Sequence, residues 1–147
     1  MLIGVPKEIK THEYRVGMTP SSVREAVSRG HTVLVQANSA QKIGITNEDY
    51  ITAGAQIAQS AEEVWDKAEL IVKVKEPQKP EYSFLKSNMI LFTYLHLAPD
   101  PGQAEALINS GCSAIAYETV TDKNGRLPLL APMSAVAGRM SVQAGAH

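Results

Sequence analysis

Cysteine is nearly absent from this sequence, since Cys112 is the single cysteine among 147 residues. One cysteine cannot form a disulfide within the chain, and no second cysteine or histidine cluster gives the spacing of a metal site. Long apolar runs are also missing, because no uninterrupted stretch approaches the roughly 20 residues that span a bilayer. The opening residues do not show a basic segment followed by an apolar one, as a secretory signal would. We therefore predict a cytoplasmic protein without a metal ion.

An excess of charge of one sign is missing as well. The chain has 14 basic and 15 acidic residues, for a net charge of −1, and the basic ones are scattered. The sequence therefore shows no clustered basic segment of the kind that binds nucleic acid. Glycine-rich phosphate loops are absent too, because neither G-x-G-x-x-G nor a P-loop pattern occurs. The chain alone is thus not expected to hold a dinucleotide, and its length and 44% hydrophobic content suit one globular domain.

The residues that are present alternate between short β-rich runs and helical patterns. Helices are predicted after Thr19 and Asp100, each of which precedes a proline. Shorter helices are predicted to begin at Thr46 or Asn47 and after Ser60. This alternation is typical of an α/β fold, with a mostly parallel sheet flanked by helices, Rossmann-like and of the flavodoxin type. The five predicted strands are Leu2–Val5, Thr32–Gln36, Leu70–Val74, Met89–Tyr94 and Ala114–Tyr117.

The last segment carries apolar residues at helical spacing, namely Met133, Val136, Ala137, Met140 and Ala144. Two interpretations have about equal support from this pattern. Either the apolar face packs on the sheet of this same domain, or the helix continues into a second domain.

Ionisable residues follow four of the predicted strands: Arg15 and its neighbours follow the first, Lys75 ends the third, His96 follows the fourth and Glu118 ends the fifth. Ligands of an open parallel sheet bind at the carboxyl ends of its strands. An arginine fork grips a carboxylate, and a histidine can exchange a proton with a carbonyl oxygen. Together these groups suit a small 2-oxo acid.

Each of these residues also has a plainer interpretation. Arg15 could be a solvated surface residue, Lys75 a charge at a strand end, and His96 a half-buried residue bonded to a backbone carbonyl. Glu118 fits a structural partner of one of the cations better than a catalyst. A second lysine, Lys73, could favour the neutral form of Lys75, or both could reach solvent. The predicted strands place Arg15, Lys75 and His96 together at the carboxyl edge of the sheet, which we call the rim. This joint placement favours a ligand-binding site over the plainer interpretations.

Several segments, spread in order over nearly the whole chain, resemble the alanine dehydrogenase family and its relative, the proton-translocating nicotinamide nucleotide transhydrogenase. The presence of Lys75 and His96 together with Arg15 favours the dehydrogenase branch. The segments are Ile3-Gly4-Val5-Pro6-Lys7-Glu8, Glu13-Tyr14-Arg15-Val16, Val72-Lys73-Val74-Lys75-Glu76-Pro77, Tyr94-Leu95-His96-Leu97-Ala98, Ala116-Tyr117-Glu118-Thr119, and Pro132-Met133-Ser134 with Ala137-Gly138-Arg139.

The resemblance implies an enzyme that converts L-alanine, NAD and water to pyruvate, ammonium and NADH. By this resemblance Arg15 would bind the substrate carboxylate, and Lys75 would bind and help polarise the substrate oxygen. His96 would be the catalytic acid and base. Tyr94 is a weaker candidate for contact with the substrate.

The resemblance also implies NAD as cofactor, held mostly by a domain that this sequence lacks, with Met133 and Ser134 lining the nicotinamide side. It divides the chain into a substrate domain, 1–131, and the start of a connecting helix, 132–147. The isolated chain is expected to be inactive, and the full-length family to form homo-oligomers. Two alternatives remain: a non-catalytic remnant that binds a 2-oxo acid or an intact relative, and the N-terminal domain of a transhydrogenase alpha subunit.

Overall fold

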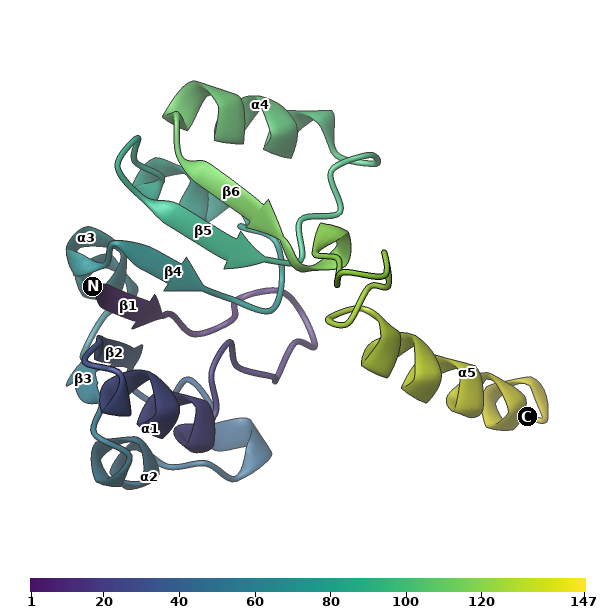
Figure 1. Ribbon diagram of the computed structural model, residues 1–147, viewed down its shortest axis with the longest axis horizontal. Coiled ribbons are helices and arrows are strands. Elements are labelled where there is room, and N and C mark those ends of the chain that lie inside the picture. Colours follow the sequence, from purple (N-terminus) through teal and green to yellow (C-terminus); the bar gives the residue numbers. More distant parts are fainter.

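A sheet of six parallel strands forms the centre of the computed structural model, which describes residues 1–147. The strand order is β3-β2-β1-β4-β5-β6, and every neighbouring pair is parallel. All carboxyl ends therefore meet at one edge, where the arrowheads of β1, β4, β5 and β6 point in Figure 1. The strands are β1 (Leu2–Val5), β2 (Thr32–Gln36), β3 (Gln56–Ala58), β4 (Leu70–Val72), β5 (Ile90–Thr93) and β6 (Ser113–Ala116).

The predicted α/β class with a parallel, Rossmann-like sheet is confirmed, but the flavodoxin-type strand order is wrong. The flavodoxin order is 2-1-3-4-5, whereas this sheet has the 3-2-1-4-5-6 order of dinucleotide-binding folds. The difference comes from β3, which the sequence analysis missed because its three residues, Gln-Ile-Ala, are too few to show a strand pattern. If β3 is left out, the other five strands of the sheet have the flavodoxin order.

Helices and 3₁₀ turns connect the strands. The helices are α1 (Pro20–Ser28), α2 (Asn47–Thr52), α3 (Ala61–Lys67), α4 (Pro101–Ser110) and α5 (Ala131–Gly145), and the turns are η1 (Gln41–Ile43), η2 (Lys79–Phe84) and η3 (Tyr117–Thr119). Thr46, Ser60 and Asp100 cap their helices as expected, each accepting a backbone N–H three residues later. Thr19 stands at the cap position of α1, but its hydroxyl contacts serine hydroxyls instead of a backbone N–H.

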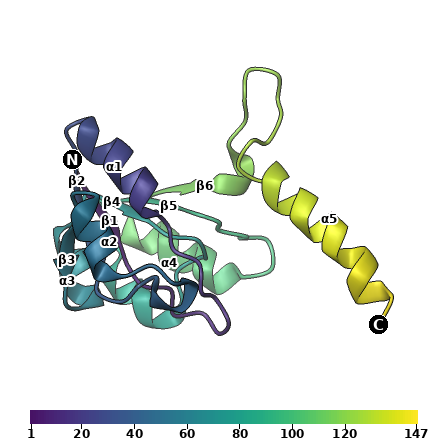
Figure 2. The ribbon, with the colours of Figure 1, turned by 90° about the horizontal axis from the view of Figure 1, so that it is seen from below.

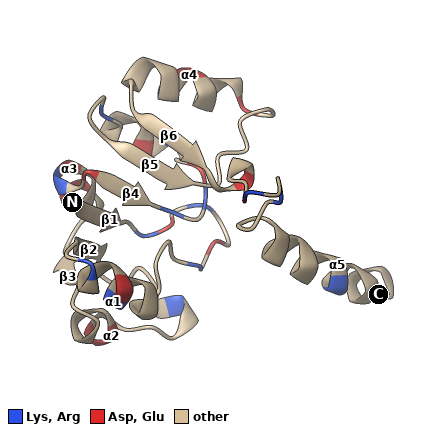
Figure 3. Cartoon of the chain, in the orientation of Figure 1, with Lys and Arg blue, Asp and Glu red and all other residues tan.

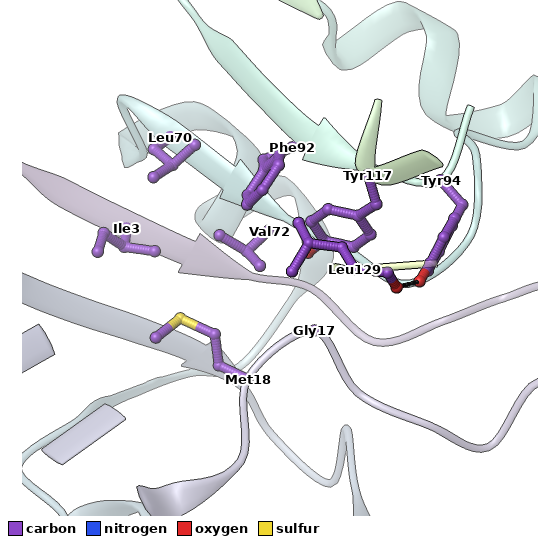
Figure 4. Close-up of a pocket in the computed structure, with 9 residues that line it drawn as sticks. All are labelled: Ile3, Gly17, Met18, Leu70, Val72, Phe92, Tyr94, Tyr117 and Leu129. Carbon is purple, nitrogen blue, oxygen red and sulfur yellow. Dashed lines mark hydrogen bonds between the residues drawn. The ribbon is translucent and has the colours of Figure 1, made fainter. Parts of the chain in front are cut away.

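The core forms two apolar clusters. One contains Trp65 of α3 with Ile71 and Leu91, and the other contains Val33 of β2 with Val23 of α1 and Tyr50 of α2. On the face of the sheet that carries α1 and α2, these helices contact β2 and β3, so the part of the same face over β4 and β5 stays open. An apolar hollow of about 460 Å³ lies there, and Figure 4 shows its lining residues: Ile3, Gly17, Met18, Leu70, Val72, Phe92, Tyr94, Tyr117 and Leu129.

The last helix, α5, projects away from the sheet in Figures 1 and 2. Every residue from Ala131 onward is exposed, including the apolar Val136 and Met140. The interpretation that this face packs on the chain's own sheet is therefore wrong. Continuation into a second domain, and the division at residue 131, stay predictions. No helix of the structure has the length and apolar character that crossing a membrane requires.

Candidate functional site

A polar hollow of about 200 Å³ lies at the carboxyl edge of the sheet and brings together four of the predicted site residues, Met133 among them. Lys75 follows β4, Tyr94 and His96 follow β5, and all three line this hollow. Charged residues gather in the loops at this edge in Figure 3, in contrast to the nearly uncharged α5. The parallel strands thus deliver ionisable groups from separate segments to one rim. The other lining residues are Lys10, Glu76, Glu118, Leu130 and Met133.

Arg15 lies beside this hollow rather than in it. It lines an adjacent apolar hollow together with residues of α5, and Met133 belongs to the lining of both. The guanidinium Nη1 of Arg15 is 3.7 Å from Met133 Sδ. Ser134 lines neither hollow, and its hydroxyl donates to the Leu130 carbonyl at 3.3 Å. The rim therefore joins Arg15, Lys75, His96 and Met133, with Ser134 set apart.

The side chain of Arg15 is held by Glu13. Nε donates to Glu13 Oε1 at 2.8 Å and Nη2 to Oε2 at 2.6 Å, while the Arg15 backbone N–H donates to the same Oε1 at 3.0 Å. These hydrogen bonds hold the pKa of Glu13 below its ordinary value. One edge of the guanidinium is thus occupied by Glu13, whereas Nη1 has as its partner the Met133 sulfur, a weak acceptor that a ligand carboxylate can replace.

Lys73 does not behave as the sequence suggested. It is fully buried, and its ammonium pairs with Glu81 at 2.9 Å and with Glu8 at 3.2 Å. Its charge is therefore compensated by two carboxylates and does not reach solvent. The expectation that Lys73 reaches water is therefore wrong, because the strand end is covered by the loop after β1 and by η2.

Glu8 connects this buried cluster to the rim. Its Oε1 accepts the backbone N–H of Val74 at 2.6 Å, and the N–H of Lys75 lies 3.4 Å away. Burial raises the pKa of Glu8 above its ordinary value, against the opposing effect of Lys73. Glu8 thus fixes the backbone at Val74 and Lys75.

Glu118 also differs from its predicted role. It pairs with no cation, and its carboxylate instead accepts the backbone N–H groups of Leu95 and His96. Glu118 is therefore a structural residue, as in the plainer interpretation, but its partners are backbone N–H groups and not a cation. Tyr94 donates its hydroxyl to the Leu129 carbonyl, a bond drawn in Figure 4, and its ring packs edge-on against Tyr117 at 4.9 Å. Its hydroxyl proton is therefore not free for a substrate.

Gly17 lets the loop that carries Arg15 lie directly against β4. A Cβ at this position would stand 2.2 Å from the Val72 carbonyl oxygen, a backbone atom that cannot move aside alone. Close backbone approach thus requires glycine here.

We expect Gly17→Ala to destabilise the chain by about 1–3 kcal/mol, the usual cost of overpacking. The matched control is Gly138→Ala, because a Cβ at Gly138 in exposed α5 would meet nothing within 4 Å. Alanine in a helix interior is favoured by roughly 0.5–1 kcal/mol, so the control should not destabilise. Urea unfolding measures both variants, and equal stabilities would contradict the close approach of Gly17 to β4.

The carboxylates that hold the rim residues in place were not predicted from the sequence. Glu81 was not considered, and Glu8 and Glu13 were given no role. One signal was available: Lys73 interrupts an apolar strand run, and a lysine at a buried position needs a carboxylate partner. Nothing in the sequence says which carboxylate that is.

Comparisons with known proteins find relatives over the whole chain. Residues 4–137 match the family described as alanine dehydrogenase/PNT, N-terminal domain. The chain is 56% identical over its full length to the alanine dehydrogenase of Halomonas elongata and 52% identical to that of Mycolicibacterium smegmatis. It spans 40% of the length of each of these relatives.

Two solved structures have a similar fold. An L-alanine dehydrogenase matches with a TM-score of 0.94 and 52% identity, over 99% of this chain and 40% of that one. A transhydrogenase from Sinorhizobium meliloti, at 24% identity, matches with a TM-score of 0.76 over 84% of this chain and 36% of that one. This second likeness shows a common fold.

Proposed function

Because the chain belongs to the alanine dehydrogenase/PNT N-terminal domain family, we propose that it is the substrate-binding part of an NAD-dependent alanine dehydrogenase. One observation carries the proposal: Lys75 and His96, which follow two separate strands, line one polar hollow, with Arg15 beside it. An ammonium, an imidazole and a guanidinium at one mouth suit a substrate with a carboxylate next to a carbonyl or an amine.

The proposed reaction converts L-alanine, NAD⁺ and water to pyruvate, ammonium, NADH and one proton. Arg15 binds the substrate carboxylate through its Nη1 edge, because Glu13 occupies the other edge. Lys75 donates a hydrogen bond to the oxygen on the reacting carbon, which stabilises negative charge there. His96 accepts a proton from the water that attacks this carbon and returns it to the leaving amine.

NAD would supply the hydride acceptor when bound, and the chain fits only its nicotinamide end. Met133, at the start of α5, is exposed and lines both hollows, so it can contact the nicotinamide. Ser134 is exposed one residue later. The pyrophosphate has no cradle here, because the loop between β1 and α1 lacks the glycine pattern of a phosphate site although the strand order would allow one. The cytoplasmic location and homo-oligomeric assembly stay predictions.

A completed enzyme tests the proposal directly. The 147-residue chain is joined to the remaining part of the Halomonas elongata relative, and NADH formation is followed with L-alanine and NAD. We expect alanine-dependent NADH formation from the completed enzyme and none from the chain alone, because the hydride acceptor must be held against the substrate carbon. A completed enzyme that folds and binds NAD but does not oxidise alanine would contradict the proposal.

We expect Arg15→Ala to weaken binding of pyruvate to the completed enzyme by roughly 2–4 kcal/mol, the scale for removing one partner of a hydrogen-bonded charge pair. Isothermal calorimetry in the presence of NADH measures the affinity. Arg29→Ala is the control, because Arg29 forms an exposed pair with Glu25 on α1, outside both hollows. If both variants bind pyruvate as well as the unaltered enzyme, Arg15 does not bind the substrate carboxylate.

A further inference from the structure

The segment that carries His96 continues past the end of its strand and so leaves the hydrogen-bond ladder. The strand β5 ends at Thr93, and the last ladder-like bond runs from the Tyr94 N–H to the Val74 carbonyl at 3.2 Å. The next two N–H groups, of Leu95 and His96, have no strand opposite them. Leu95 is only 3% exposed, so its N–H needs a partner within the protein.

Glu118 supplies that partner from a different strand end. Its Oε1 accepts the His96 N–H at 2.6 Å and the Leu95 N–H at 3.1 Å, and its Oε2 lies 3.3 Å from the same Leu95 nitrogen. The sequence separation is 22 and 23 residues, because Glu118 stands in η3, directly after β6. Hydrogen bonds to a carboxylate are stronger than those to a neutral oxygen. One side chain thus holds two consecutive backbone groups.

The backbone of His96 has a conformation that needs such support. Its φ is 50°, in the left-handed region that residues with a Cβ rarely adopt. Such residues persist where the surroundings determine their conformation in several ways. Here a third bond acts from another direction, since Gln103 Nε2 of α4 donates to the Leu95 carbonyl at 2.9 Å within the buried interior. The left-handed turn directs the chain from β5 to the rim.

We propose that Glu118 is a positioning residue that holds His96 at the substrate hollow through these two backbone hydrogen bonds, a role that rests on the proposed function of His96. Both carboxylate oxygens of Glu118 lie within hydrogen-bond distance of backbone nitrogen atoms. Glu118 also lines the hollow, but its hydrogen bonds run to the backbone, so in this proposal it acts on the reaction through His96. Glu118 holds the backbone at His96 in the same way that Glu8, from the loop after β1, holds the backbone at Lys75.

The first test observes His96 itself, in the 147-residue chain and without any activity assay. Labelling with ¹⁵N-histidine gives one backbone amide signal for each of the four histidines, and the His96 signal is the one lost in His96→Gln. We expect the His96 amide proton to resonate downfield in the unaltered chain, because its acceptor is charged. In Glu118→Ala it should move upfield and exchange faster with solvent, and in Glu118→Gln, which keeps one carbonyl acceptor, it should lie in between.

The second test measures turnover in the completed enzyme. We expect Glu118→Ala to lower kcat by about tenfold to hundredfold, the scale for a catalytic group displaced by about 1 Å, with KM for alanine changed less than about threefold. Glu118→Gln should recover part of kcat. The control is Asp49→Ala, which removes a carboxylate bond of 2.7 Å to the Thr46 N–H at the cap of α2 and should leave kcat unchanged.

Two results would overturn the proposal: an unmoved His96 amide signal in Glu118→Ala, or a Glu118→Gln enzyme as slow as Glu118→Ala, which would mean that the charge acts on the reaction directly. An unaltered completed enzyme without alanine-dependent activity would instead contradict the proposed function. In that case the amide signals alone decide whether Glu118 positions His96.

Discussion

In the completed enzyme, His96→Ala is expected to lower kcat for alanine oxidation by about 10²–10⁴-fold, the usual contribution of a general acid and base. The water that attacks the substrate carbon must lose a proton, and the leaving amine must gain one. His96 lines the polar hollow with Lys75, and alanine at this position removes the only imidazole among its lining residues. Substrate affinity should change much less, because Arg15 and Lys75 stay in place.

Steady-state kinetics, with kcat and KM for alanine measured separately, tests this expectation. His31→Ala is the matched control, because His31 directly precedes β2 and so lies at the opposite edge of the sheet from the rim. A loss of kcat no larger than in the control would show that His96 does not exchange the proton. A rise in KM with kcat unchanged would indicate that His96 only binds the substrate.

The largest effect on stability is expected for Lys73→Met, at about 3–5 kcal/mol near neutral pH. Lys73 is fully buried, and it is paired with Glu8 and Glu81, whose side chains are 2% and 5% exposed. Methionine fills a similar volume but leaves two buried carboxylates without their cation. Removal of one partner of a buried pair leaves an uncompensated charge, which is why the cost exceeds the value of the pair itself.

The cost of Lys73→Met should depend on pH with a definite sign. Burial already raises the pKa of Glu8 in the folded chain, and Lys73 opposes this, so the substitution raises the pKa further. The folded variant then binds more protons than its unfolded chain, and its stability falls as the pH rises from the ordinary glutamate pKa through the raised one. The difference from the unaltered chain should therefore be smallest near pH 4 and largest at neutral pH.

Urea unfolding of the 147-residue chain at several pH values measures this difference. Lys67→Met is the control, because Lys67 forms an exposed pair with Glu63 one turn away on α3, and such pairs contribute about 0.3–0.5 kcal/mol. A Lys73→Met chain as stable as this control at neutral pH would mean that the buried carboxylates find other partners or stay protonated.

Much of the fold could be predicted from local patterns in the sequence. Four of the five predicted strands overlap β1, β2, β4 and β5 closely, and the fifth overlaps β6, because apolar β-rich runs and helix caps are signals within a few residues. The failure was β3, which has three residues and one fully buried side chain, Ala58. If β3 is omitted from the observed sheet, the dinucleotide-binding strand order becomes the flavodoxin order.

By itself, the sequence determined that Lys75 and His96 lie at one edge of the sheet, because in a parallel sheet the residue after each strand must stand at the carboxyl end. Only the tertiary structure decided what holds them there: Glu8 binds the backbone at Lys75, and Glu118 binds the backbone at His96. The physical reason is the range of the contacts. A strand end follows from a few neighbouring residues, whereas Glu8 and Val74 meet across 66 residues of chain, and that meeting depends on which strands become neighbours.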